Sequence, residues 1–414
     1  MSGKYPRVAF FACAYNEIDG VANTAHHFEA YAARHHLPFL SIHGGYESYL
    51  RKEDTLTKVE FERGWASFPL DKKHDFDLLF GKYYSAARKL VHEFQPDLVH
   101  ITGPSDVGII GALIAHKLHV PLVASWHTNL HEYAARRAVS MLPWLPSGWR
   151  RRIGTTIEAG SLKALIRYYK IPRLLFAPNP QLISLLEKGT GKPCFPMGRG
   201  VDIELFTPER RNRQGGLFTV GYVGRITVEK DVGLLPEMEQ GLLDAGFSNF
   251  RFLVVGQGAA EPWLRQHLRH AEFTGVLRGG ELANAYANMD LFVFPSRTDT
   301  YGNVVLEAMA SGVPAIVTDE GGPQFIVQPG KTGAVAKHAR DFVGQILWFA
   351  ANRQQRETMA RAARAFAVSN TWDAVFDSVY ALYDRVLTVS AGSMSYCPSE
   401  ATALREQNGN ATRE

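Results

Sequence analysis

Two carboxylates stand on either side of a glycine in the stretch Asp299-Thr-Tyr-Gly-Asn-Val-Val-Leu-Glu307. An apolar run precedes this stretch and a Gly-Val-Pro sequence follows it, so residues 302–311 are predicted to form a helix after a buried strand. The N–H groups at the start of such a helix attract a phosphate or a sugar oxygen, and Gly302 lets the backbone approach closely. Asp299 in the loop and Glu307 on the helix are placed to accept protons from hydroxyl groups. Donors for phosphate beside acceptors for hydroxyls suit a sugar nucleotide.

Two cations follow the predicted strand at residues 218–224. Arg225 and Lys230 lie on one strand-to-helix loop, in the context Tyr-Val-Gly-Arg at a strand end. A planar guanidinium and a flexible ammonium can grip a diphosphate from two sides and neutralise charge that grows as a glycosidic bond breaks. The alternative is that both are ordinary surface residues, but their position at a strand end favours anion binding.

His127 and Gly20 also follow predicted strands. His127 ends the strand at residues 122–127, at the carboxyl edge where ligands collect, although a histidine is more often a packing or surface residue. Gly20 opens a predicted helix after the first strand, where a glycine permits an open loop and brings helix N–H groups near a ligand. Turn geometry explains many glycines at such positions.

Two further strand ends carry weaker signals. Gly256 lies in a Gly-Gln-Gly sequence after the strand at residues 250–255, where it would let a nucleoside lie close to the backbone. Leu277 follows a short strand at residues 272–274, a location that often frames the base in doubly wound parallel sheets that bind nucleotides.

The elements that position these residues alternate between apolar strand-like runs and amphipathic helical stretches. This alternation predicts α/β domains with doubly wound parallel sheets. Two separate series imply two Rossmann-like domains with a ligand-binding cleft between them. The first series of strands is residues 7–15, 38–43, 98–102, 122–127, 174–177 and 195–197, and the second is residues 218–224, 250–255, 291–294 and 315–318.

Composition narrows the class of protein. A chain of 414 residues is too long for a single hydrophobic core, so we expect two domains. No apolar run approaches the roughly 20 residues that are needed to span a membrane. The three cysteines have no paired spacing, which argues against a disulfide framework or a zinc site. The N-terminus lacks the apolar core of a signal peptide, so we expect a cytoplasmic protein.

Charge is concentrated in one segment. The net charge of +4 is too mild to imply nucleic acid, but residues 133–173 contain many more basic than acidic side chains. Trp144 and Trp149 precede Arg150, Arg151 and Arg152, and indoles beside cations suit a contact with anionic lipid head groups. The alternative is a solvated basic face on an ordinary insertion.

The order of these motifs resembles the retaining GT-B glycosyltransferases of family 4. The resemblance covers roughly residues 7 to 388. It rests on five sequences: Glu17-Ile-Asp-Gly20, Ser125-Trp-His127, Arg199-Gly-Val-Asp202, Gly224-Arg225 with Glu229-Lys230, and Asp299 with Glu307. It implies an α/β GT-B fold, with two Rossmann-like domains facing a deep cleft and a C-terminal helix crossing back to the N-terminal domain. Members use UDP- or GDP-sugars as co-substrates and need neither a cofactor nor a metal ion.

The resemblance also implies roles for individual residues. Arg225 and Lys230, after Gly224, would hold the leaving-group phosphates, and His127 would contact the donor sugar near its anomeric centre. Asp299 would hold sugar hydroxyls and Glu307 the ribose hydroxyls. Backbone N–H groups would come from Gly302, Asn303 and Val304. The family signature usually has Glu where this chain has Asp299, which shortens the side chain by one methylene and bears on the choice of sugar.

The expected domains follow from the resemblance and the composition. Residues 1–205 would form the acceptor domain, residues 206–217 a linker, and residues 218–370 the nucleotide-sugar domain. Residues 371–388 would form the returning helix, and residues 389–414, which lack a burial pattern, a disordered tail.

The function expected is transfer of a hexosyl group to a hydroxyl acceptor by front-face substitution with retention. The acceptor would be a membrane lipid or a lipid-linked envelope glycan, with the enzyme at the inner face of an anionic membrane. Two alternatives stay open: the same chemistry on a soluble sugar or sugar phosphate, and a nucleotide-sugar-binding protein without turnover. The sequence predicts no nucleic-acid partner and leaves the oligomeric state open.

Overall fold

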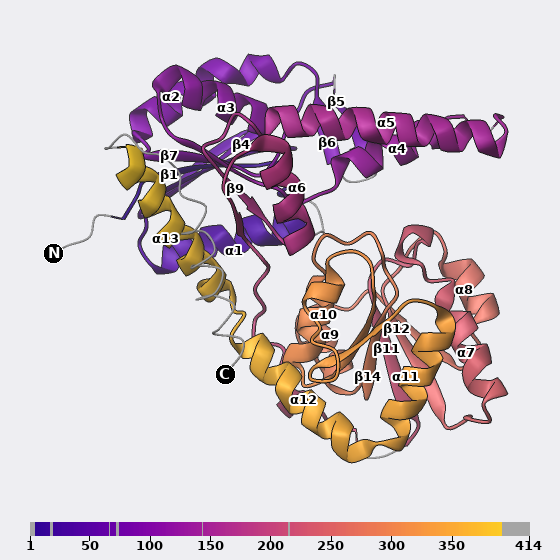
Figure 1. Ribbon diagram of the computed structural model, residues 1–414. Helices are drawn as coiled ribbons and strands as arrows, with labels where there is room; N and C mark the ends of the chain where they lie inside the picture. The colour runs from indigo at the N-terminus through magenta and orange to yellow at the C-terminus, as the bar shows by residue number, and fades with distance from the viewer. Residues whose placement is uncertain are drawn as a thin grey trace. The chain divides into compact units, whose positions relative to one another are not determined.

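The chain divides into two compact units in the computed structural model, which describes residues 5–16, 20–65, 67–71, 74–142, 144–213 and 216–390. Unit 1 comprises Met1–Gly198 and Phe376–Glu414, and unit 2 comprises Arg199–Val375 (Figure 1). Unit 1 is therefore built from two segments of the chain that unit 2 separates. Most of the tail expected at residues 389–414, and Glu17 of the first motif, lie outside the described residues.

Unit 1 is built on a sheet with the strand order β10-β9-β8-β7-β1-β2-β4-β3. Its pairings are parallel except for the β3–β4 pair. Strands β1, β7, β8 and β9 are buried along their length, as in parallel sheets covered on both faces. The bounds are β1 Val8–Ala12, β2 Phe39–Gly45, β3 Tyr49–Glu53, β4 Leu56–Glu62, β7 Leu98–Ile101, β8 Leu122–Ser125, β9 Leu174–Ala177 and β10 Cys194–Pro196; a separate hairpin pairs β5 Ser67–Asp71 with β6 His74–Asp77.

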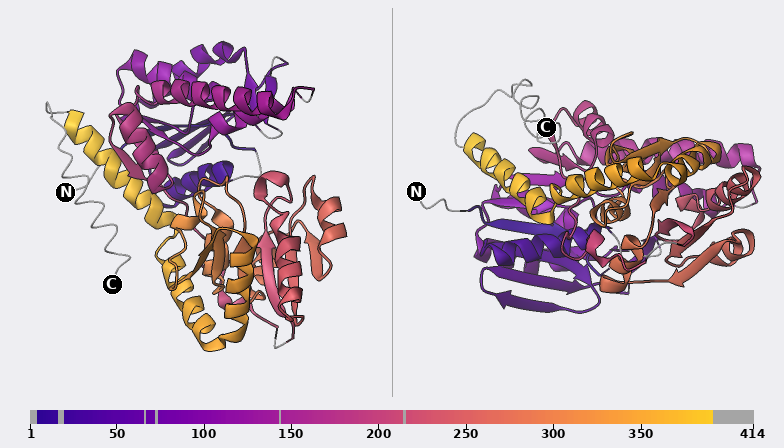
Figure 2. Two further views of the ribbon diagram at one scale, coloured as in Figure 1. Left: turned by 45° about the vertical axis from the view of Figure 1, so that its right-hand side comes forward. Right: turned by 90° about the horizontal axis from the view of Figure 1, so that it is seen from below.

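Helices cover both faces of this sheet (Figure 2). Alternate residues of β1 show the two faces: Phe10 meets Phe28 of α1, whereas Phe11 lies against Gly111 of α3. Both layers are therefore anchored on the same central strand. The helices of unit 1 are α1 Gly20–Arg34, η1 Phe80–Tyr83, α2 Tyr84–Phe94, α3 Asp106–Leu118, α4 Leu130–Ser140, α5 Ser147–Tyr168 and α6 Pro180–Thr190.

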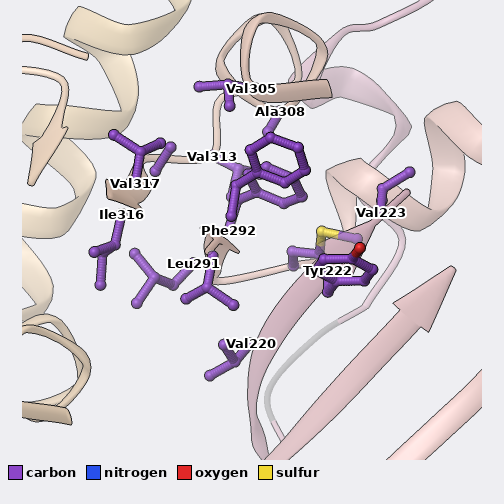
Figure 3. Close-up of a cluster of buried hydrophobic side chains, with 14 of the residues drawn as sticks. Val220, Tyr222, Val223, Leu291, Phe292, Val305, Ala308, Val313, Ile316 and Val317 are labelled. Carbon is purple, nitrogen blue, oxygen red and sulfur yellow. The ribbon is translucent and has the colours of Figure 1, made fainter. Parts of the chain in front are cut away.

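Unit 2 contains a parallel sheet with the strand order β13-β12-β11-β14-β15-β16. The order reverses between β11 and β14, as in the doubly wound sheets that bind nucleotides. Its core joins apolar residues of β11, β14 and β15 to those of α10 (Figure 3). The strands are β11 Phe218–Val223, β12 Phe250–Val255, β13 Ala271–Gly275, β14 Leu291–Phe294, β15 Ala315–Thr318 and β16 Gly333–Ala336.

The helices of unit 2 alternate with its strands, and η2 precedes the first of these strands. They are η2 Pro208–Arg210, η3 Val228–Lys230, α7 Leu234–Asp244, α8 Glu261–His267, α9 Gly279–Ala287, α10 Asn303–Ala310, η4 Pro323–Phe325, α11 Ala339–Ala351 and α12 Arg353–Val368. Residues of the segment expected as a linker pack within this unit: Phe206 is buried in its core, and Arg211 and Arg213 both bind Asp290.

The last helix, α13 (Trp372–Ser390), begins in unit 2 and belongs to unit 1 from Phe376 onward. Phe376 stacks on Phe28 of α1 with ring centroids 4.4 Å apart, and the Tyr31 hydroxyl lies 2.5 Å from Oδ1 of Asp377. The predicted return of the C-terminal helix to the N-terminal domain is thus confirmed. Among the described residues, no helix has the length and apolar composition required to cross a membrane.

Candidate functional site

Most of the unit 2 residues predicted for the site follow β11 and β14, the strands on either side of the order reversal. Gly224 and Arg225 come directly after β11, and Lys230 ends η3 on the same loop. Asp299 lies on the loop after β14. The loops that follow the two strands at such a reversal lead to opposite faces of the sheet and leave a crevice between them. Open α/β sheets bind their ligands in this crevice.

Lys230 and Asp299 form an ion pair across this reversal. The Lys230 ammonium nitrogen lies 2.7 Å from each carboxylate oxygen of Asp299, and the two side chains are 11% and 23% exposed. Burial alone would raise the pKa of Asp299, but the charge and hydrogen bonds of Lys230 outweigh it and hold the pKa below its ordinary value. The carboxylate is therefore ionised at neutral pH.

Arg225 is held near this pair by its backbone. The buried Tyr222 hydroxyl donates to the Arg225 carbonyl oxygen at 2.8 Å, which fixes the start of the loop. The half-exposed guanidinium lies 3.8 Å from Glu229, and its charge contributes to the lowered pKa of Asp299. Two cations and two carboxylates thus share one electrostatic environment.

Two glycines bring the loops after β11 and β12 into backbone contact. Gly224 and Gly256 have φ angles of 154° and 130°, which L side chains rarely adopt. A Cβ on Gly256 would lie 2.0 Å from the Gly224 carbonyl oxygen. Leu277 follows β13 and packs partly against the unit 2 core. Contact of these residues with a nucleoside remains a prediction.

Helix α10 begins one residue later than predicted. Gly302 is its N-cap with φ of 106°, and a Cβ there would lie 3.0 Å from the Pro323 ring. Asn303 and Val304 occupy the first helical positions, whose N–H groups have no partner within a helix. The expected anion-attracting helix start is therefore four residues after Asp299.

Glu307 lies one turn further along α10. The Tyr286 hydroxyl of α9 donates to its Oε2 at 2.9 Å. Burial raises the pKa of Glu307 to about 7, and the hydrogen bond from Tyr286 offsets part of that rise. The side chain is half-buried, so this carboxyl group changes protonation near neutral pH while it stays accessible to a ligand.

In unit 1, His127 lies two residues beyond β8 and is buried. Its Nε2 lies 2.6 Å from the Ser125 hydroxyl oxygen. His127 also lines a small pocket of about 40 Å³, together with Thr102, Gly103 and other residues after β7. Gly20 is the first residue of α1, and residues 17–19 just before it lie outside the described residues.

The basic segment forms the paired helices α4 and α5 and the turn between them (Figure 1). Trp144 and Trp149 are 73% and 61% exposed. Arg151 and Arg152 are exposed on α5, and Arg150 is half-buried. Indoles and cations are therefore presented together on the surface of unit 1.

The predicted residues gather in two groups, one in each unit, and sequence reasoning missed partners in both. Tyr286 holds Glu307, yet its sequence signal is that of a packing tyrosine on an amphipathic helix. Ser125 holds His127 and was visible as a hydroxyl group at the end of an otherwise apolar strand. Neither was predicted as a site residue.

Comparison with known proteins gives two family matches. The model described as glycosyl transferases group 1 matches residues 218–352, and that of glycosyltransferase family 4 matches residues 18–173. A GDP-mannose-dependent alpha-mannosyltransferase of Mycobacterium tuberculosis is 31% identical over 71% of this chain and 74% of that protein. Sulfoquinovosyl transferase SQD2 of Arabidopsis thaliana is 33% identical over 69% of this chain and 56% of that protein.

Solved structures with the same fold have low sequence identity. Sucrose-phosphate synthase from Thermosynechococcus elongatus superposes with a TM-score of 0.71 at 17% identity, covering 92% of this chain and 99% of that chain. HepE of Anabaena, solved with UDP and glucose, has a TM-score of 0.64 at 15% identity, covering 92% of this chain and 100% of that chain. These matches show the GT-B fold.

Proposed function

Because the chain belongs to the group 1 glycosyltransferases, we propose that it transfers a hexosyl group from a GDP- or UDP-sugar to a hydroxyl of a membrane lipid or lipid-linked glycan. The transfer retains the anomeric configuration and uses no metal ion. The observation that carries this proposal is the Lys230–Asp299 ion pair at the order reversal, with Asp299 four residues before the start of α10.

The donor is bound by complementary groups of unit 2. An ammonium has three N–H donors, and Lys230 directs two of them at Asp299, which leaves one for a diphosphate oxygen. Arg225 and the first N–H groups of α10 supply further positive charge. Glu307 accepts from the ribose hydroxyls and Asp299 from hydroxyls of the sugar.

The reaction is a front-face substitution. The bond between the anomeric carbon and the phosphate oxygen breaks, and its electron pair leaves with the nucleoside diphosphate. The acceptor oxygen bonds to the anomeric carbon on the same face, and its proton passes to the departing phosphate. Lys230 already engages both oxygens of Asp299, which supports a binding role for this carboxylate and not attack on the sugar.

GDP-mannose is the first donor to test. The names of two relatives support this choice. The proteins from Mycobacterium tuberculosis and Mycolicibacterium smegmatis are both named GDP-mannose-dependent alpha-mannosyltransferases. GDP-mannose carries its sugar in the alpha configuration, so an alpha product means retention.

A lipid acceptor is supported by two observations. One relative, from Acholeplasma laidlawii, is named alpha-monoglucosyldiacylglycerol synthase, and α4–α5 exposes Trp144 and Trp149 beside arginines. This surface is proposed to dock on anionic membrane. A soluble acceptor would instead give the same turnover without vesicles.

The test combines ligand stabilisation with turnover. Thermal unfolding is measured with GDP-, UDP- and ADP-sugars, because a ligand at about 100 times its Kd stabilises the folded state by about 2.7 kcal/mol. Release of nucleoside diphosphate is then followed with and without lipid vesicles and with EDTA, and NMR couplings report the anomeric configuration of the product. Binding without any release would contradict transferase function, and loss of activity in EDTA would contradict metal independence.

A further inference from the structure

The Lys230–Asp299 ion pair has a second pair beside it, with the charges reversed. Asp231 follows Lys230 on the loop after β11. Arg297 lies two residues before Asp299 on the loop after β14. Nε of Arg297 lies 3.7 Å from Oδ2 of Asp231, so the two loops attract each other through both pairs. At this distance the second pair is an electrostatic contact and not a hydrogen bond.

A hydrogen bond to the backbone joins the same two loops. The Thr298 hydroxyl donates to the Glu229 carbonyl oxygen at 3.1 Å. Each of residues 229–231 therefore contacts one of residues 297–299. A single contact would let one loop pivot about the other, whereas three adjacent contacts oppose that motion.

Arg297 also binds the loops after β15 and β16. Its Nη1 donates to Oε1 of Glu320 and lies 3.7 Å from Oδ1 of Asp319. Its Nη2 donates to the Lys337 carbonyl oxygen at 2.5 Å. A guanidinium has five N–H donors in a fixed planar fork, so one side chain joins the loops after four strands. An isolated ion pair on a side chain that is 27% exposed contributes little, but a network of several partners contributes more.

The loop that carries Asp299 is supported from the other side by the backbone of the loop after β15. The Gly322 N–H donates to the Asp299 carbonyl oxygen at 2.7 Å. A Cβ on Gly322 would lie 2.1 Å from the Thr300 carbonyl oxygen, so the two backbones are in close contact. Residues 297–300 are thus held against the rest of unit 2, and the loop after β11 is held against them.

Binding of a diphosphate would disturb only one of the three contacts between the loops. Its negative charge competes with Asp299 for the Lys230 ammonium and weakens that pair. The contacts of Arg297 and Thr298 do not involve this ammonium, so they keep the loop in place when the ligand arrives. A loop that is already in its binding conformation loses less entropy on binding.

We propose that Arg297 and Thr298 are positioning residues that hold Lys230 within reach of the donor diphosphate. Arg297 acts through Asp231, and Thr298 acts through the Glu229 carbonyl oxygen. The consequence for donor binding rests on the proposed function, in which Lys230 contacts the leaving-group phosphates. The contacts among the loops do not rest on it.

Hydrogen exchange, read by mass spectrometry, tests these contacts in the full chain without a donor. The Lys230 and Asp231 amides donate to carbonyl oxygens of their own loop at 3.1 and 3.0 Å, so their exchange reports opening of that loop. Arg297→Gln should speed exchange in residues 226–234 about fivefold or more. Unchanged exchange there overturns the proposal, whatever the protein transfers.

Arg251→Gln is the matched control. Arg251 is 32% exposed and binds Glu272 and Thr219 near the start of β12, at the opposite end of that strand from the site. It should leave exchange in residues 226–234 unchanged. Equal acceleration in Arg251→Gln and Arg297→Gln would assign the effect to loss of overall stability and overturn the proposal.

Calorimetry with GDP and with UDP measures the consequence for ligand binding. Arg297→Gln should weaken the nucleoside diphosphate that binds the wild type about tenfold, close to the loss of one hydrogen bond to a charged group. Arg297→Lys keeps the charge but not the fork, so it should recover only part of the affinity. Thr298→Val removes only a hydroxyl and should give a smaller loss, which keeps the test available if Arg297→Gln does not fold. Wild-type affinity in both Arg297→Gln and Thr298→Val overturns the proposal.

Asp231→Asn separates positioning from charge. Removing a carboxylate beside an anion would by charge alone strengthen diphosphate binding, whereas loss of the contact with Arg297 should weaken it. Asparagine is tolerated at the positive φ of 50° found here, so the backbone is preserved. Stronger binding by Asp231→Asn overturns the proposal. If neither nucleotide binds the wild type, the proposed function is wrong, and hydrogen exchange still decides whether Arg297 holds the loop.

Discussion

Both carboxylate oxygens of Asp299 lie 2.7 Å from the ammonium nitrogen of Lys230, although 69 residues separate the two in sequence. Strand order brings them together, since β11 and β14 pair directly through Val220 and Leu291. Where no ligand is bound, each group neutralises the other. The pair therefore holds the ammonium in place before a diphosphate arrives.

Removing the carboxylate charge is expected to weaken both folding and catalysis. Asp299→Asn should lower the free energy of unfolding by about 1–3 kcal/mol, since hydrogen bonds to charged groups contribute about that much. It should lower kcat/KM by about 10²-fold if Lys230 is misplaced. Denaturant unfolding and steady-state kinetics measure the two effects.

The stability effect of Asp299 has a defined pH dependence. Its folded-state pKa lies below the unfolded value, so its contribution is present above the ordinary aspartate range and is lost as the pH falls through the lowered pKa. The gap between wild type and Asp299→Asn should therefore close below about pH 4. Glu357→Gln, in an exposed ion pair with Arg353, serves as the control and should change little. A gap that persists in acid would contradict this role for the pair.

Glu307 should behave in the opposite way. Its pKa is raised to about 7, so its contribution to stability is complete below the unfolded value and is lost as the pH rises through 7. Glu307→Gln should therefore gain stability relative to wild type as the pH rises from about 4.5 to about 7, and the difference should level off above that. Denaturant unfolding at these pH values measures the difference.

Donor binding should also follow the protonation of Glu307. An ionised carboxylate accepts hydrogen bonds from ribose hydroxyls, so the affinity for a nucleotide should rise as the pH passes through about 7. Calorimetry of nucleoside diphosphate binding should show this rise for wild type and a weaker, flat dependence for Glu307→Gln. If the affinity of both proteins depended on pH in the same way, Glu307 would be excluded as the source of the pH dependence.

A Cβ at Gly256 should be far more damaging than one in an open helix. Gly256→Ala would place this atom 2.0 Å from the Gly224 carbonyl oxygen at a φ of 130°, and we expect a loss of about 3 kcal/mol or more. Gly344→Ala in α11 meets no atom within 4 Å and should stabilise by up to about 1 kcal/mol. Chemical denaturation compares the two, and equal effects would show that the loops after β11 and β12 can separate.

Membrane docking through α5 should depend on its cations and on salt. Replacing Arg151 and Arg152 by alanine should reduce co-sedimentation with anionic vesicles at low salt, at about 1 kcal/mol for each cation near the surface. The same exchange at Arg353 and Arg361, both exposed on α12, removes equal charge and should have no effect. If the wild-type protein did not co-sediment with the vesicles at either low or high salt, the docking proposal would be wrong.

Much of the fold could be predicted because buried parallel strands are continuous apolar runs. Strands β9, β12, β14 and β15 have the predicted bounds. The β3–β4 hairpin could not be predicted in this way, since Tyr49–Glu53 is mostly polar and exposed. An edge strand of this composition has the pattern of a loop.

Site residues that belong to sequence motifs could be predicted, whereas the residues that they contact could not. Lys230 and Asp299 were both predicted as site residues, but their ion pair depends on strand order. His100 was visible as a polar residue within the apolar strand β7, yet its partner Tyr383 lies 283 residues away. Such contacts between distant positions are set by three-dimensional packing and leave no local pattern.

Unit 1 is made from two segments of the chain, one before and one after unit 2, and this arrangement determines the order of folding during synthesis. Unit 2 is continuous and can complete its core as soon as Val375 leaves the ribosome, whereas Phe28 and Tyr31 must wait for Phe376 and Asp377. The first unit to be translated is therefore the last to be finished. Until then the nascent chain exposes one apolar face of α1, a surface that a chaperone would recognise.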